Sequence, residues 1–211
     1  MAGLGIGPDQ FAVFRIADPE ERADAIEARL APALSRVAEV VVAGLSRVAA
    51  VPLLVHPGKL VRRRDVAPEE GFVAFCASDK GYHKVPYLAL VVTREQLHAR
   101  VAVRGGADRD GVMRRALQRE ASNLARKGKP FRKLRSYASW DYEELPEIAP
   151  AHSTAFWEEL ADALAPEANA GPGIDVGTAW PAEEARNLAL GDVLGAFRDL
   201  APLYKLLANA R

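Results

Sequence analysis

The sequence predicts an α+β protein: a single compact domain with a largely antiparallel sheet, on which helices from the N-terminus, the middle and the C-terminus pack. Three observations predict this class. Of the 211 residues 49% are apolar, which is enough for a core. Apolar residues follow a helical period before residue 50, a strand-like pattern from residue 51 to 103, and a helical period again from residue 110. The strands follow one another instead of alternating with helices, which favours antiparallel pairing.

The first long helix is expected to begin after Asp18. An aspartate at this position can accept hydrogen bonds from the free N–H groups of the first turn, and Pro19 suits the first helical position. Apolar residues then recur at helical spacing as far as Leu45. Pro32 interrupts this run and removes a backbone donor, so a break or kink is expected near residues 30–31.

Four strands are expected next, at residues 51–55, 72–75, 87–92 and 97–103. The third is apolar on both faces, as in a central strand. The fourth alternates, with a polar face that carries His98, Arg100 and Arg104. This face is either ordinary solvent-exposed surface or the floor of an anion-binding site. The short polar link at residues 93–96 predicts an antiparallel hairpin.

The second half of the chain is expected to contain a helix at about residues 110–127, ended by Gly128 and Pro130. Further elements are expected in this order: a weak strand at 134–140, a helix at 153–164, a loop at 166–173, a weak strand at 174–180 and a last helix from about 190. Pro202 predicts a kink in that last helix.

Composition excludes several classes of protein. The 28 basic and 28 acidic residues cancel, which argues against a wholly basic nucleic-acid-binding protein but not against a local basic patch. Cys76 is the one cysteine, so there is no intramolecular disulfide; it is expected to be a buried small hydrophobe. The most apolar stretch, residues 40–45, is far too short to span a membrane. We therefore expect a cytoplasmic protein without membrane contact.

The chain shows no sign of a second domain or of a prosthetic group. Neither a repeat nor a shift in composition divides it, so one domain is expected over residues 1–211, with residues 1–8 as a flexible N-terminus. The motifs of zinc sites, acyl transfer and nucleotide binding are absent. We predict no catalytic residue, no metal and no cofactor. Trp140, Trp157 and Trp180 follow the spacing of the elements and are expected in the core.

Two short segments concentrate cations beside a ring. The first follows the strand at 51–55 and places one imidazole among permanent cations; the second is a glycine turn in which a tyrosine offers a stacking face beside two lysines. Guanidinium groups in such segments can hold phosphate or carboxylate through two hydrogen bonds. Together with the polar face of the fourth strand, they give these candidate ligand-binding residues: His56, Lys59, Arg62, Arg63, Lys80, Tyr82, Lys84, Arg100 and Arg104. The competing interpretation is a pair of solvated loops whose cations pair with surface acids.

The charges are also unevenly distributed later in the chain. Residues 111–136 contain nine basic residues and one acidic residue, whereas residues 137–170 contain eight acidic residues and no lysine or arginine. Either the first segment forms a basic surface for an anionic partner, or the two segments neutralise each other across the fold.

The string VHPGKLVRRRDVAPEEGFVAF at residues 55–75, followed by KGYHKVP at 80–86, resembles the central segment of the YktB-like family of bacterial proteins. The strings at residues 11–32 and 199–207 are similar to the two ends of that family. Eight residues fall on the family pattern: His56, Lys59, Arg62, Arg63, Gly81, Tyr82, Lys84 and Pro86. The resemblance implies a compact single-domain α+β protein and no activity, because the family is known as one of unknown function.

Three positions depart from the family pattern. Leu60 and Tyr87 stand where the family often has histidine, and Arg64 stands where it often has threonine. If those polar positions form a catalytic or metal site in relatives, this chain has lost ligands, which weakens an enzymatic function here.

The sequence thus favours a binding protein for a phosphate-bearing ligand or nucleic acid. A first alternative is an enzyme acting on a small anionic substrate, with His56 as acid/base and Arg62 or Arg63 as the anion clamp. A second is a module for self-association or regulatory docking through the charged segments, and the oligomeric state is left open. Convergence of the cations on a pocket favours a small ligand, whereas a flat basic strip favours nucleic acid.

Overall fold

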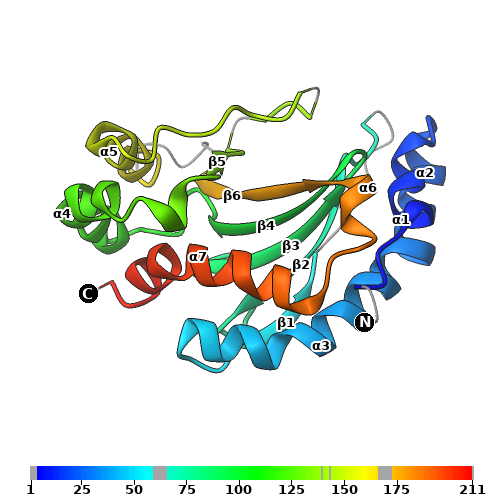
Figure 1. Ribbon diagram of the computed structural model, residues 1–211, viewed down its shortest axis with the longest axis horizontal. Coiled ribbons are helices and arrows are strands. Elements are labelled where there is room, and N and C mark those ends of the chain that lie inside the picture. The colour runs from blue at the N-terminus through cyan, green and yellow to red at the C-terminus, as the bar shows by residue number, and fades with distance from the viewer. Residues whose placement is uncertain (1–3, 59–65, 139, 143, 166–172, 211) are drawn as a thin grey trace.

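A six-stranded antiparallel sheet forms the centre of the protein, in the order β1-β2-β3-β4-β6-β5 (Figure 1). The computed structural model describes residues 4–58, 66–138, 140–142, 144–165 and 173–210. The strands are β1 Leu54–Pro57, β2 Glu70–Cys76, β3 Tyr87–Thr93, β4 Gln96–Val103, β5 Arg135–Ser136 and β6 Ile174–Pro181. The predicted α+β fold with an antiparallel sheet is therefore confirmed.

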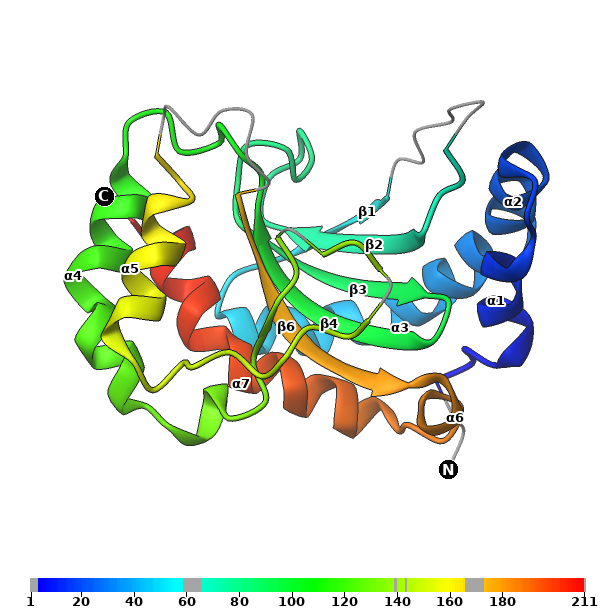
Figure 2. The same cartoon turned by 90° about the horizontal axis from the view of Figure 1, so that it is seen from above.

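Helices cover one face of this sheet and both of its ends. The helices are α1 Pro8–Ala12, α2 Pro19–Ala25, α3 Ala31–Ala49, α4 Val112–Arg126, α5 Thr154–Asp162, α6 Ala182–Ala185 and α7 Leu190–Ala208. α3 and α7 lie side by side on one face, α4 and α5 lie at one end, and α1 and α2 lie at the other end (Figures 1 and 2). Among the described residues, no helix lies on the opposite face of the sheet (Figure 2).

The N-terminal helices largely agree with the expectation from the sequence. The carboxylate of Asp18 accepts hydrogen bonds from the backbone N–H groups of Glu20 and Glu21, each at 2.9 Å, which confirms the predicted cap. The irregularity expected from Pro32 takes the form of a π-helical turn at Ile26–Leu30, immediately before α3. A π turn displaces the regular hydrogen-bond pattern where the proline has no N–H to donate.

The N-terminal segment before α1 is packed against the fold in its described part. The backbone N–H of Leu4 donates to the carbonyl of Leu188 at 3.1 Å, and Ile6 is buried. Residues 1–3 lie outside the described residues.

The sheet differs from the expected strands at its two edges. The first strand begins at Leu54, because Ala50 ends α3 in the left-handed conformation and the chain still turns at Leu53, whose N–H donates to the hydroxyl of Ser46. The weak strand expected at 134–140 is only two residues long. The central hairpin is as predicted, with β3 and β4 antiparallel and Val92 opposite Leu97.

The core lies between the sheet and the helices α3 and α7. Alternate residues of the central strands face it, such as Phe75, Leu90 and Val101, all fully buried. Trp157 is also fully buried there, as predicted. Trp180 is only half-buried, but it packs against the core. The prediction that Trp140 belongs to the core is wrong, because its ring lies over the other face of the sheet, against His98.

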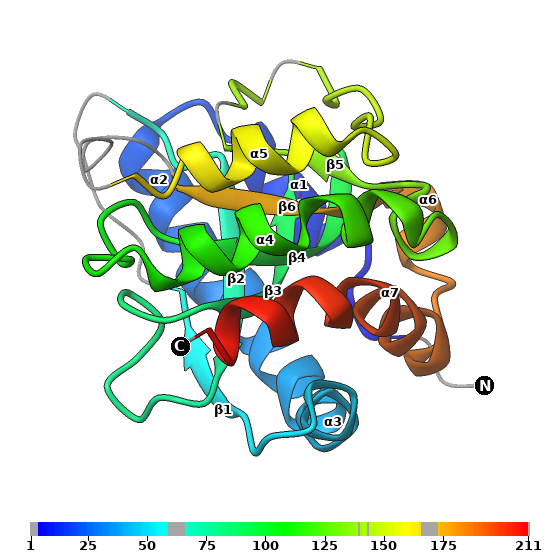
Figure 3. The same ribbon diagram turned by 90° about the vertical axis from the view of Figure 1, so that its left-hand side faces the viewer.

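The helices of the two charged segments lie next to each other at one end of the sheet. α4, in the basic segment, packs against α5, in the acidic one (Figure 3). Arg114 of α4 forms an ion pair with Asp162 of α5 at 3.0 Å. Arg115, Arg119 and other basic side chains of α4 remain exposed. The segments therefore compensate each other in part.

Candidate functional site

The sheet face on which no described helix lies, called the open face below, has small residues on both sides of Arg100. Arg100 of β4 stands opposite Ala89 of β3 on one side and Gly177 of β6 on the other. Because these neighbours are small, the long side chain of Arg100 can lie across the sheet. A methyl group on Gly177 would come within 2.1 Å of the carbonyl oxygen of Ala99, so only glycine fits there.

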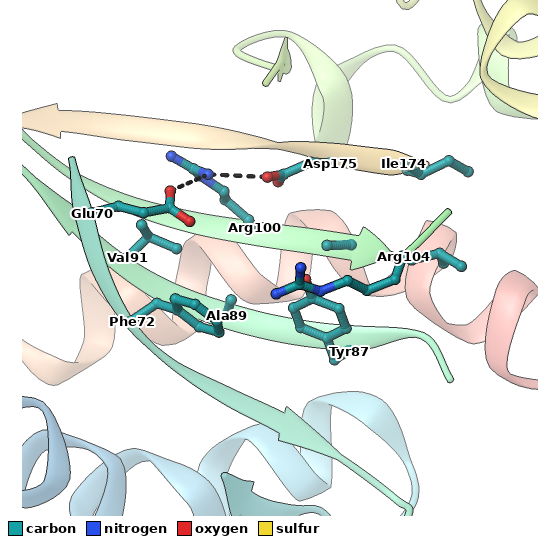
Figure 4. A pocket seen from close by; sticks show the side chains of 11 residues that line it. Glu70, Phe72, Tyr87, Ala89, Val91, Arg100, Arg104, Ile174 and Asp175 are labelled. Carbon is teal, nitrogen blue, oxygen red and sulfur yellow. Dashed lines mark hydrogen bonds and ion pairs between the residues drawn. The ribbon is translucent and has the colours of Figure 1, made fainter. Parts of the chain in front are cut away.

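A buried ion cluster occupies the middle of the open face. The Nη1 group of Arg100 donates to Oε2 of Glu70 at 3.2 Å and to Oδ2 of Asp175 at 3.0 Å, so that strands β2, β4 and β6 each contribute one member (Figure 4). Only 3% of the Arg100 side chain is exposed, against 28% for Glu70 and 26% for Asp175. The guanidinium thus lies deepest in the cluster, and both acidic side chains are partly exposed, although Oδ1 of Asp175 is itself buried.

Residues 137–138, 140–142 and 144–148, called the strap below, cross part of the open face (Figure 2). The ring of Tyr137 lies 4.2 Å from the guanidinium carbon of Arg100, and the ring of Trp140 lies 5.5 Å from it. Such contacts stabilise a cation by interaction with the ring face. The hydroxyl of Tyr142 hydrogen-bonds to Glu70. The strap therefore shields Arg100 from water with aromatic rings.

The cluster leaves polar atoms without partners. Within the described residues, four buried atoms around Arg100 have no hydrogen-bond partner: its own Nε and Nη2, Oδ1 of Asp175 and the hydroxyl of Tyr137. Buried polar atoms in folded proteins usually have a partner, so such a group is a reason to look for a bound molecule.

The electrostatics of the cluster leave negative charge in excess when both acids are ionised, which disfavours the ionised form of Asp175. Burial raises the pKa of Asp175 to about 6; the nearby Glu70 carboxylate also raises it, while Arg100 opposes the rise. Although burial alone lowers it, the pKa of Arg100 is raised overall by Asp175 and Glu70, so this guanidinium stays charged. Two carboxylates share one cation.

A cavity of about 110 Å³ opens beside this cluster. Its lining residues are Glu70, Phe72, Tyr87, Ala89, Val91, Arg100, Ala102, Val103, Arg104, Ile174 and Asp175. It is called the open-face pocket below. Charged groups stand at two sides of it, and aromatic and aliphatic side chains form the rest of its wall.

Arg104 lies at the rim of the open-face pocket, across from the ion cluster. Its guanidinium lies above Tyr87 and extends toward the pocket (Figure 4), and its carbon is 5.6 Å from the ring centre of Tyr82. Arg104 is exposed, and no carboxylate in the described part of the chain forms an ion pair with it. The rings of Tyr82 and Tyr87 are in contact, with centres 5.0 Å apart. The guanidinium of Arg104 is thus available to a ligand and lies beside two aromatic rings, that of Tyr82 and that of Tyr87 (Figure 4).

Of the predicted site residues, Tyr82, Arg100 and Arg104 come together around the open-face pocket. Lys80 and Lys84 are exposed in the turn between β2 and β3. Three further predicted residues, Lys59, Arg62 and Arg63, lie outside the described residues.

His56 is on the open face but at its far edge. Its strand β1 places it opposite Ala74 of β2, and its Nε2 lies 2.9 Å from the backbone carbonyl of Ser78. A carbonyl only accepts hydrogen bonds, so Nε2 carries the proton and donates it to this contact. His56 is not among the residues that line the open-face pocket.

The polar face of β4 is largely buried and is not ordinary solvent-exposed surface. His98 and Arg100 are buried, and only Arg104, beyond the end of the strand, is exposed. Burial, followed by the charge of Arg100, lowers the pKa of His98 well below its usual value, so this imidazole is neutral. It packs edge-on against the rings of Tyr137 and Trp140.

Sequence reasoning missed the acidic half of the site. Glu70 and Asp175 were not singled out, although Asp175 interrupts an apolar strand, which is unusual for a charged residue. That interruption, taken with the arginine inside β4, was the available signal for a buried ion pair. The aromatic residues of the strap were also missed as parts of the site.

The fold and the pocket define an α+β protein with a small polar pocket on the open face of an antiparallel sheet. The chain belongs to the DUF1054 family, a domain of unknown function, which matches residues 7–204. The resemblance to the YktB-like family is thereby confirmed, because that family is the same one. No curated protein matches the chain.

The described residues contain neither a helix that could span a membrane nor a cluster of potential metal ligands. None of the helices there has both the length and the apolar character needed to cross a bilayer. In the same residues, no three histidine, cysteine or acidic side chains are grouped as metal ligands would be.

Proposed function

We propose that the protein binds a small ligand with an anionic group of the phosphate type in the open-face pocket. The observation that carries this proposal is the position of Arg104, whose guanidinium extends toward the pocket and pairs with no carboxylate of the described residues. A guanidinium is permanently charged and can donate two parallel hydrogen bonds to a phosphate or carboxylate. The neighbouring rings of Tyr82 and Tyr87 hold it at the rim.

The size of the pocket supports a small ligand. A cavity of about 110 Å³ has room for on the order of ten water-sized groups. An anionic group and a short carbon chain fill such a space.

The acids of the open face favour this ligand over nucleic acid. Glu70 and Asp175 line the pocket, and the exposed strap residues Asp141, Glu144 and Glu147 lie on the same side of the sheet. A long polyanion would approach all of these carboxylates, which repel it. A compact anion can contact Arg104 alone.

The two other functions have less support. His56, the acid/base of the enzymatic alternative, already donates to Ser78 and is outside the pocket lining. Self-association through the charged segments is less favoured, because α4 and α5 of one chain already pack together and share an ion pair.

The proposal is tested by calorimetric titration of inorganic phosphate and propyl phosphate into the protein at pH 7.5 and low salt. Binding to the wild type is expected, and Arg104→Gln should weaken it about tenfold or more, since a hydrogen bond to a charged group contributes about 1.5–3 kcal/mol. Arg109→Gln is the matched control, because Arg109 is exposed in the same loop and does not line the pocket.

Two results would overturn the proposal. One is that neither probe binds the wild type. The other is that both bind Arg104→Gln as tightly as the wild type. Tight, steeply salt-dependent binding of a single-stranded oligonucleotide that Arg104→Gln leaves intact would favour the nucleic-acid alternative instead.

A further inference from the structure

The side of the open-face pocket across from Arg104 is acidic. The carboxylates of Glu70 and Asp175 both turn toward Nη1 of Arg100, while the guanidinium of Arg104 lies on the other side, above Tyr87 (Figure 4). The pocket therefore has a cationic end and an end that presents carboxylate oxygens.

The acidic end carries more negative than positive charge. One guanidinium nitrogen serves two carboxylates, and the remaining buried donors of Arg100, Nε and Nη2, contact no acceptor in the described residues. About a quarter of each acidic side chain is exposed and both residues line the pocket, where Oδ1 of Asp175 is buried and has no hydrogen-bond partner among the described residues. Both carboxylates can accept further hydrogen bonds, because each oxygen has more than one acceptor site.

The raised pKa of Asp175 agrees with this charge balance. Burial is the main cause of the rise to about 6, and the Glu70 carboxylate adds to it, whereas Arg100 and Arg104 oppose the rise without cancelling it. A second cation placed beside Glu70 and Asp175 would supply what Arg100 alone does not.

We infer that the ligand is a compact zwitterion, with its anionic group at Arg104 and a protonated amine at Glu70 and Asp175. This inference rests on the proposed function and adds the chemistry of the ligand's second end. Small amino acids and short aminoalkyl phosphates share this chemistry. The volume of about 110 Å³ leaves room for only a short chain between the two groups.

The experiment compares two probes that differ only at the second end. 2-Aminoethyl phosphate and propyl phosphate have the same number of heavy atoms, and a methyl group in the second replaces the ammonium group of the first. In calorimetric titrations of the wild type at pH 7.5, the amine is expected to improve the dissociation constant about tenfold, as a charge-assisted hydrogen bond does. β-Alanine and butyrate form the corresponding pair for a carboxylate ligand, so the two pairs distinguish the two sources of the zwitterion.

Variants assign the effect to the acidic end. Glu70→Gln should remove most of the preference for the amine, measured as the ratio of the dissociation constants of 2-aminoethyl phosphate and propyl phosphate for the same variant. Glu95→Gln is the control, because Glu95 is an exposed carboxylate that pairs with Arg94 and lies outside the pocket lining. Its preference for the amine should equal that of the wild type.

The outcomes separate this inference from the proposed function. Equal affinity of the wild type for 2-aminoethyl phosphate and propyl phosphate, with the same equality for the carboxylate pair, overturns the zwitterion and leaves the anion site standing. Absence of binding by all four probes overturns both. The comparison on the wild type requires no variant, so it stays decisive even if Glu70→Gln does not fold.

Discussion

Asp175→Asn is the substitution that tests the electrostatics of the pocket without any ligand. Asparagine keeps the size of the side chain and removes the titration. In the folded wild type, burial raises the pKa of Asp175 from its usual value near 3.8 to about 6. The folded state therefore holds this proton more tightly than the unfolded state, and the wild type loses stability as pH rises through this window.

The magnitude follows from the size of the rise. One pKa unit corresponds to about 1.4 kcal/mol, so the full shift corresponds to about 3 kcal/mol. Between pH 4.5 and pH 7.5 the wild type loses about two thirds of this 3 kcal/mol, because Asp175 changes its protonation mainly within that range. Water at the exposed 26% of the side chain lowers the expected effect further. We expect the free energy of unfolding of the wild type, relative to Asp175→Asn, to fall by about 1–2 kcal/mol over this range.

The assay is urea unfolding of both proteins, followed by circular dichroism at pH 4.5 and pH 7.5. Taking the difference between the two proteins cancels the other titrating groups. Asp199→Asn, an exposed aspartate of α7, controls for the change in net charge. A difference that stays constant, or that grows in favour of the wild type as pH rises, would refute the reasoning. It would mean that Arg100 fully compensates the carboxylate and that the acidic end of the pocket carries no excess charge.

Three further predictions concern the framework of the site. Gly177→Ala should lower the melting temperature by several degrees or abolish folding, because the new methyl group would overlap the carbonyl of Ala99. Thermal unfolding measures this change. An unchanged melting temperature would contradict the close approach of β4 and β6. Cys76 is buried and burial raises the pKa of its thiol, so a thiol-reactive dye should label it only after urea is added; rapid labelling of the native protein would show that the end of β2 is accessible. Asp18→Ala should cost about 1 kcal/mol in urea unfolding through loss of the cap of α2, whereas Asp9→Ala, in α1, should cost less.

Much of the fold could be predicted because it depends on local patterns. The change of apolar period placed the helices and central strands, and the polar link after Val92 placed the hairpin. Asp18 and Pro32 marked one helix start and one irregularity. The edges were less predictable, since the pairing of β1 and β5 depends on neighbours that are distant in the chain.

The strap shows that a weak strand signal can mislead. The expected strand at 134–140 contains Tyr137 and Trp140, but only Arg135–Ser136 pairs with β6. The following rings instead bury themselves against Arg100 and His98 on the open face. Trp140 was placed in the core because sequence alone does not show which of two faces an aromatic residue covers.

The candidate site was predictable only in its cationic half. Arg100 and Arg104 could be found because the alternation in β4 is local. Glu70 and Asp175 are 30 and 75 residues away from Arg100 in sequence, and only the sheet register brings them to it. The prediction that His56 belongs to the same site stays a prediction.

The most direct test of the central claim is to map the binding of propyl phosphate by ¹H–¹⁵N correlation spectra of the wild-type protein. The open-face pocket predicts that the largest shifts fall on the backbone amides of Glu70, Tyr87, Arg104 and Asp175, and that they saturate together with a single dissociation constant. Shifts that instead gather on the exposed basic side of α4, or no shifts at all, would contradict the account.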